Sequence, residues 1–123
     1  MRIAPFLCMM LIASSVGAAR SAQVVEMTLE EKARKSTAVV IAVAGVGTTV
    51  VKHGAALQLV EFRVVTALKG APVTTLKLLV SGGLIESSLD CCKVGGRYLL
   101  FVQQLGEGIS VPINGQFSVY RLD

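Results

Sequence analysis

The adjacent thiols of Cys91 and Cys92 are the feature of the sequence best suited to chemistry. In an oxidising compartment such a pair can work as a redox switch or form a disulfide with a second chain. A bond between the two neighbours would close a small, strained ring that is readily reduced. The alternative is that both are loop residues, one of which packs inward as a small apolar side chain. The sequence has no Cys-x-x-Cys motif, so a thioredoxin-like oxidoreductase is not predicted.

The other residue types that act as catalysts or ligands have no suitable partners in the sequence. His53 is the only histidine, it lies beside Lys52 at a predicted turn, and no acidic residue adjoins it. A catalytic triad or a zinc site needs a histidine with matched partners. Glu30 and Glu31 are explained by the start of a helix, and the remaining carboxylates show no spacing typical of an acid–base pair. The sequence therefore predicts no catalytic residue, no cofactor and no metal site.

The N-terminus has the three parts of a secretory signal peptide. Arg2 supplies a positive charge, residues 3–13 form a short apolar run, and residues 14–19 are mostly small. We therefore assign residues 1–19 to a cleavable signal and expect a secreted or periplasmic protein. An uncleaved N-terminal anchor is the alternative.

The expected mature chain carries a mild positive charge. Of 12 lysines and arginines, 11 remain once Arg2 is removed, against 8 aspartates and glutamates, so the net charge falls from +4 to about +3. Charges of both signs alternate along the chain, which is typical of a soluble surface and not of a nucleic-acid-binding one. The uncharged run of residues 36–51 is shorter than the roughly 20 residues that a membrane span needs, and glycines interrupt it. No stable membrane span is expected after cleavage.

A short helix is predicted within an N-terminal segment that covers residues 20–36. Thr28 and Glu31 have the spacing of a capping box, in which the Thr28 side chain accepts a hydrogen bond from the Glu31 backbone. Basic residues follow toward the negative end of the helix, which should end near Ser36. The helix has few apolar residues to bury, so we expect a lid or plug and not a core element.

Residues 37–123 are predicted to form strands. A β-branched run bounded by Gly45 and Gly47 favours a strand buried on both faces, and residues 52–54 are typical of a hairpin tip. The next run alternates, with Val60, Phe62, Val64 and Leu68 on one face and Glu61 and Arg63 on the other. The expected strands are Ala38–Ala44, Val60–Leu68, Thr74–Val80, Arg97–Val102, Ile109–Val111 and Gln116–Tyr120.

Five or six short strands, each with one apolar face, must close on themselves or pack against a second sheet. No helical pattern lies between them, so parallel strand–helix–strand units are not predicted. A closed barrel leaves few unpaired edges. These patterns therefore predict an all-β closed barrel of five or six strands preceded by a short helix.

The order of these pieces resembles the netrin-like and tissue-inhibitor-of-metalloproteinases group of OB-fold domains, as in small secreted bacterial proteins of that shape. The resemblance spans nearly the whole mature chain, and its two strongest pieces, Leu68–Gly70 and Gly95–Leu99, are structural signals. It implies a five-stranded Greek-key barrel outside the cytoplasm that is used for binding. With the resemblance, the expected fold class is an all-β, five- to six-stranded OB-like Greek-key barrel preceded by a short helix. The matching pieces are Thr28–Glu31 before Ala38–Val40, then Val64–Gly70, Gly82–Gly83 and Val94–Phe101.

One departure from that group concerns the N-terminus. The metalloproteinase inhibitors present a cysteine at the mature N-terminus, where its amine and carbonyl bind the zinc of the target. Cleavage here would expose Arg20 or Ala22 instead. Inhibition of a metalloprotease is therefore the alternative function and not the expected one.

Nucleic acid is not an expected partner. OB-folds that bind single strands use aromatic platforms in a basic groove. Phe62, Tyr98 and Phe117 are assigned to the core by the alternation, which leaves Phe101 and Tyr120 among the aromatic residues of the mature chain.

Together these patterns predict an exported, non-enzymatic binding module. Its loops Gly47–Gly54 and Leu84–Gly95 are expected to contact a protein or another extracytoplasmic ligand. A thiol redox protein that uses Cys91 and Cys92 is a second alternative.

Overall fold

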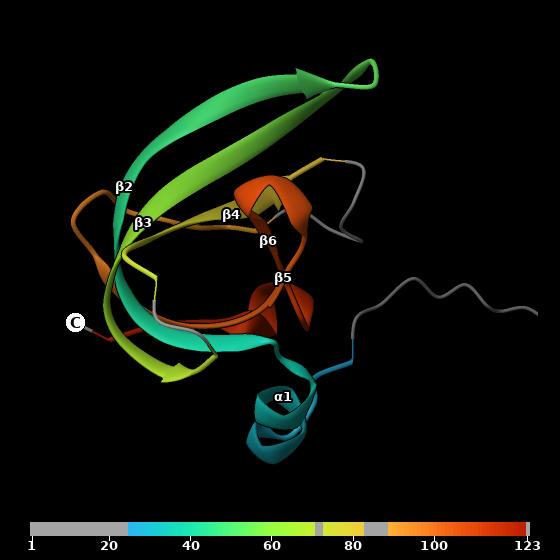
Figure 1. Ribbon diagram of the computed structural model, residues 1–123. Helices are drawn as coiled ribbons and strands as arrows, with labels where there is room; N and C mark the ends of the chain where they lie inside the picture. Colours follow the sequence, from blue (N-terminus) through green and yellow to red (C-terminus); the bar gives the residue numbers. More distant parts are fainter. Residues whose placement is uncertain (1–24, 71–72, 83–88, 123) are drawn as a thin grey trace, which may run out of the picture.

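The structure, a computed structural model, describes residues 25–70, 73–82 and 89–122 (Figure 1). The predicted signal peptide, residues 1–19, lies outside the described residues. The elements are helix α1 (Leu29–Lys35), strands β2 (Ala38–Lys52), β3 (Ala55–Lys69), β4 (Thr75–Ser81), β5 (Arg97–Gln104), β6 (Ile109–Pro112) and β7 (Val119–Arg121), and the short 3₁₀ helices η3 (Gly106–Gly108) and η4 (Gly115–Ser118).

The sheet closes into a ring, which confirms the predicted all-β barrel. Its strand order is β2-β3-β4-β6-β5-β7, and an additional pairing of β2 with β5 closes the ring. All neighbouring pairs are antiparallel except β4 and β6, which run parallel. The parallel pair arises because the chain crosses from β4 to β5 before it returns to β6, as in a Greek key.

The glycines at 45 and 47 do not end β2, in contrast to the prediction. The strand continues to Lys52, and Gly45 and Val46 together oppose Glu61 of β3, which makes a β-bulge. A glycine in a strand commonly marks a bulge and not an end, because it lets the backbone bend while the pairing resumes. The predicted hairpin tip at residues 52–54 is confirmed, and Figure 1 shows the hairpin curving past the ends of the other strands.

The core fills the inside of the ring. Val60 and Phe62 are buried as predicted, and Val64 packs against them. Leu68 was expected on the same face but is 58% exposed. Two register shifts between β2 and β3 leave Val65 and Leu68 without a paired residue, so each shift reverses the alternation of β3. A second, smaller cluster lies on the other side of β3 and β4 and consists of Leu57, Leu59, Leu79 and Ile109.

The C-terminal strands differ from the prediction in extent. Gln116, Phe117 and Ser118 form a 3₁₀ turn, and only residues 119–121 form a strand. The turn is held because the Asn114 backbone N–H donates to Ser118 Oγ at 2.5 Å and the Phe117 N–H donates to the Asn114 carbonyl at 3.1 Å. Strands β6 and β7 pair with β5 and not with each other.

The cap of helix α1 is confirmed, but its burial differs from expectation. Thr28 Oγ1 accepts from the Glu31 backbone N–H at 3.1 Å. Lys32, expected on an exposed helix, is 0% exposed. Its ammonium donates to the Phe117 carbonyl at 2.9 Å and to the Tyr120 hydroxyl, so the helix is fixed to the C-terminal part of the barrel.

The Lys69–Gly70 piece joins β3 to the helix. Lys69 Nζ donates to the Ala33 carbonyl at 2.7 Å and to the Arg34 carbonyl at 3.1 Å, which satisfies acceptors at the end of the helix. Gly70 has a φ of 94°, and a Cβ there would lie 2.7 Å from the Thr37 carbonyl oxygen. Only glycine fits this position, so the motif has a structural role.

Candidate functional site

A groove of about 320 Å³ lies between the β2–β3 hairpin and the segment that precedes β5. One wall is the hairpin, and the other consists of Cys91, Cys92 and Val94. We call this space the groove. Its full lining is Gly45, Gly47, Thr48, Thr49, Gln58, Leu59, Val60, Val80, Cys91, Cys92 and Val94.

The groove brings together parts of both segments that the sequence predicted as contact loops. Gly47, Thr48 and Thr49 come from the first, and Cys91, Cys92 and Val94 come from the second. Residues 84–88 of the second segment lie outside the described residues. Because these segments are separated by about 40 residues in the sequence, only the closed ring makes them neighbours.

Cys91 and Cys92 are joined by a disulfide at one wall of the groove. Both are half-buried, and both pack against the core cluster that contains Phe62 and Tyr98. The pair therefore combines a packing role with a position on the surface of a groove.

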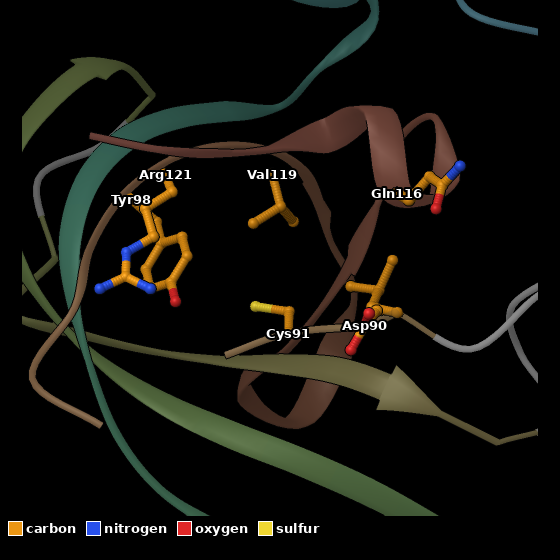
Figure 2. Close-up of a pocket in the computed structure, with 7 residues that line it drawn as sticks. Asp90, Cys91, Tyr98, Gln116, Val119 and Arg121 are labelled. Atoms are coloured by element: carbon orange, nitrogen blue, oxygen red, sulfur yellow. The ribbon is translucent and has the colours of Figure 1, made fainter. Parts of the chain in front are cut away.

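The other side of Cys91 faces a second pocket of about 220 Å³. Figure 2 shows the Cys91 sulfur pointing into the space between Tyr98 and Val119, with Arg121 beside the Tyr98 ring. Asp90 lies at another part of the wall, so the pocket has charges of both signs at its edge. The full lining is Leu89, Asp90, Cys91, Tyr98, Gln116, Val119 and Arg121.

The segment that carries the disulfide is fixed by hydrogen bonds on its C-terminal side. The Lys93 backbone N–H donates to the Tyr98 hydroxyl at 2.8 Å, and the Gly95 N–H donates to the Ala44 carbonyl at 2.8 Å. A Cβ on Gly96 would lie 2.9 Å from the Tyr98 ring, so this position requires the absence of a side chain. The Gly95-Gly96-Arg97-Tyr98 piece thus positions the wall of the groove.

The backbone pairing of the outer edge of β2 ends where the groove begins. From Ala38 to Val43 it pairs with β5, and the Ala44 N–H donates to the Gly96 carbonyl at 2.9 Å. From Gly45 to Val51 that edge has no backbone partner among residues 25–70, 73–82 and 89–122. The groove is therefore bordered by backbone N–H and C=O groups that are available for pairing.

The other candidate residue from the sequence, His53, is not part of the groove lining. It lies at the exposed hairpin tip with a φ of 52°. Within the part of the chain that the structure describes, no group of three or more histidine, cysteine, aspartate or glutamate side chains could hold a metal ion. None of the helices described is long and apolar enough to cross a membrane.

Sequence reasoning did not identify Gln58 and Val80 as lining residues. Both belong to strands whose alternation predicts only which side faces inward, and the sequence does not tell where along the barrel a space is left. Val80 is the last inward-facing residue of β4, and this position at the end of the strand is the one feature of the sequence that could have indicated its place in the groove lining.

No protein-family description, curated protein or solved structure matches this chain.

Proposed function

We propose that this protein is an exported, non-enzymatic binding module whose groove holds part of another exported protein. The observation that carries the proposal is the meeting of the two contact segments around one groove, with the disulfide in its wall. Loops and strand ends held by a rigid barrel are where binding residues commonly lie.

The surface chemistry at the groove supports a protein ligand. No charged residue belongs to its lining, while Val46, Val51 and Val94 are 64%, 75% and 61% exposed around it. Apolar side chains gathered at a concave surface are typical of interaction sites, because a partner removes them from water.

The test is calorimetric titration of candidate exported proteins into the purified secreted chain. We expect a binding partner whose affinity falls at least ten-fold with Thr49→Glu, which places a negative charge in the groove. Val65→Glu is the matched control, because Val65 is an exposed β3 residue outside the groove lining. Equal effects of the two variants would remove the groove from the proposal, and turnover of a substrate by the purified chain would contradict it.

The export part of the proposal follows from the N-terminal pattern of residues 1–19. Mass spectrometry and N-terminal sequencing of the secreted form should give a chain that begins at Arg20 or Ala22. The resemblance to netrin-like and metalloproteinase-inhibitor-like domains remains part of this proposal, supported by the strand order and the preceding helix. A mature chain that begins with cysteine would instead favour the inhibitor alternative.

A thiol redox function is the second candidate, favoured by the position of the Cys91–Cys92 disulfide between the groove and the second pocket. An exported dithiol would transfer two electrons and two protons to this bond. Its own thiols would become a disulfide, while Cys91 and Cys92 would become thiols. Redox titration of the secreted chain should then show a two-electron transition that is lost when both cysteines are replaced by serine. An unchanged titration and unchanged phenotypes in that double variant would end this candidate.

A further inference from the structure

We propose that the outer edge of β2 from Gly45 to Val51 binds an extended, acidic peptide segment of another exported protein as an added β-strand. This rests on the binding function proposed above and names the chemistry of its ligand. We call residues 45–51 the β2 edge.

The first observation is the length of unpaired backbone. Hydrogen bonding between β2 and its neighbour β5 extends to Ala44, and the β2 edge continues beyond it while its inner side stays paired with β3. Alternate residues of a strand present their N–H and C=O groups to opposite sides. The β2 edge therefore presents a row of donors and acceptors of the kind that another extended chain satisfies.

The second observation is that, beyond the bulge at Gly45 and Val46, the β2 edge carries neither of the residue types that normally protect an unpaired strand. Proteins place charged residues, prolines or very short strands at such edges to prevent pairing with other chains. The sequence from 45 to 51 is Gly-Val-Gly-Thr-Thr-Val-Val, with no charge and no proline. Its β-branched residues favour extended pairing.

The third observation is the groove itself, which lies along the β2 edge. Side chains of an added strand alternate between two faces. Those on one face would enter the space lined by Thr49, Val80, Val94 and the disulfide. Backbone hydrogen bonds would then supply affinity, and the fit of these side chains in the groove would select among peptide sequences.

Charge indicates which peptide fits and disfavours a second copy of this chain. Lys93 is exposed between the lining residues Cys92 and Val94, and Lys52 follows the β2 edge at its other end. A peptide with an acidic residue opposite Lys93 would be attracted to its ammonium group. Two copies of the expected mature chain, each with a net charge of about +3, would instead repel each other.

The experiment starts from a phage-displayed library of random nonapeptides, selected on the immobilised secreted protein. The enriched sequences are synthesised in two further forms, with N-methyl groups on the odd or on the even backbone nitrogens. Binding is measured by fluorescence anisotropy. An added strand uses alternate N–H groups, so one methylated series should lose at least ten-fold in affinity while the other binds like the parent peptide.

Three further results are expected if the proposal holds. Amide hydrogen exchange should slow on alternate residues of the β2 edge when the peptide binds. Thr49→Glu, which places a negative charge in the groove, should weaken binding of the acidic peptide at least ten-fold, while Val65→Glu leaves it unchanged. Peptides with net negative charge should dominate the selection.

Several results would overturn the proposal while leaving the binding function standing. Equal binding of both methylated series would mean that the ligand docks through side chains only. Failure to enrich any peptide, while a whole exported protein still binds in a Thr49-dependent manner, would exclude an extended segment. Sedimentation that shows a dimer which Thr49→Glu dissociates would assign the β2 edge to a second copy. Absence of both peptide and protein binding would remove the binding function as well.

Discussion

Two regions of this barrel differ in which side chains they bury and which they expose. Around α1 and η4, which we call the helix region, polar side chains are buried. Around the hairpin tip and the disulfide, which we call the hairpin region, apolar side chains are exposed. The buried polar residues of the helix region are Lys32, Ser36, Asn114 and Ser118, and the exposed apolar residues of the hairpin region are Val46, Val50, Val51 and Val94.

Each buried polar group in the helix region has specific partners. The Lys32 ammonium lies 4.7 Å from the Tyr120 ring centroid, in addition to its hydrogen bonds, and 3.5 Å from a Glu26 carboxylate oxygen. Asn114 Oδ1 accepts from the Met27 N–H at 2.7 Å, and Asn114 Nδ2 donates to the Val25 carbonyl at 3.0 Å. A buried polar group is costly without its partner, so such a network permits only one arrangement.

The comparison separates the region that we expect to govern stability from the region that we expect to govern binding. The helix region has satisfied its hydrogen-bonding groups internally over sequence separations of 85 to 89 residues. The hairpin region exposes valines, and the outer edge of its β2 strand has no backbone partner within the described part of the chain, so we propose that another molecule binds there. Substitutions in the first region should change stability, and substitutions in the second should change binding.

The largest effect is expected from Lys32→Ala. This change leaves the Phe117 carbonyl and the Tyr120 hydroxyl without their donor and opens a space in the packing, so we expect a loss of about 3 kcal/mol in the free energy of unfolding. Denaturant unfolding measures it. Lys35→Ala is the control, because Lys35 is exposed and forms only a surface pair with Glu31 at 3.3 Å. Similar losses in the two variants would mean that the buried network does not hold the helix.

The next effect is expected from Asn114→Ala. It removes both side-chain hydrogen bonds to residues 25 and 27, so we expect a loss of about 2 kcal/mol in the free energy of unfolding, measured by denaturant unfolding. Residues 25–27 should also become more sensitive to proteolysis than in the parent chain. Gln116→Ala, an exposed change in the same turn, is the control. It should change the free energy of unfolding by no more than about 0.5 kcal/mol and leave the proteolysis of residues 25–27 as in the parent.

A smaller effect is expected from Gly96→Ala. The new Cβ would lie 2.9 Å from the Tyr98 ring and 3.0 Å from the Lys93 carbonyl oxygen. The ring and the disulfide segment must shift, at a cost of about 1–2 kcal/mol, measured by thermal unfolding. Gly106→Ala is the matched control, since no atom lies within 4 Å of its added Cβ. An unchanged transition in Gly96→Ala would show that this wall of the groove is not tightly positioned.

The smallest effect on stability is expected from Thr49→Glu in the hairpin region. Thr49 is exposed, so the free energy of unfolding should change by no more than about 0.5 kcal/mol, as judged by denaturant unfolding. The same variant is expected to lose ligand binding. A large loss of stability would mean that Thr49 is needed for the fold. The expected separation between stability effects in the helix region and binding effects in the hairpin region would then be wrong.

The sequence predicted those parts of the fold that depend on neighbouring residues. The Thr28 cap, the turn at residues 52–54 and the inward positions of Val60 and Phe62 depend on local hydrogen bonds or on alternation, and all three are confirmed. Leu68 was placed wrongly because a bulge reverses alternation, and a bulge depends on the partner strand.

The candidate site was predicted in its parts but not in its arrangement. Cys91, Cys92 and the segment that begins at Gly47 were singled out from the sequence, yet nothing in it places them at one groove. The burial of Lys32 was likewise missed, because a lysine on a short, polar helix is typical of an exposed face. Its partners, Phe117 and Tyr120, lie 85 and 88 residues further along the chain.

By itself, then, the sequence determined the helix cap, the turns and the alternating faces of most strands, because interactions between near neighbours decide these features. The closed ring, the disulfide wall facing the hairpin and the unpaired β2 edge were decided by the tertiary structure alone. Each depends on which strands become neighbours, and that is set by the packing of the whole core.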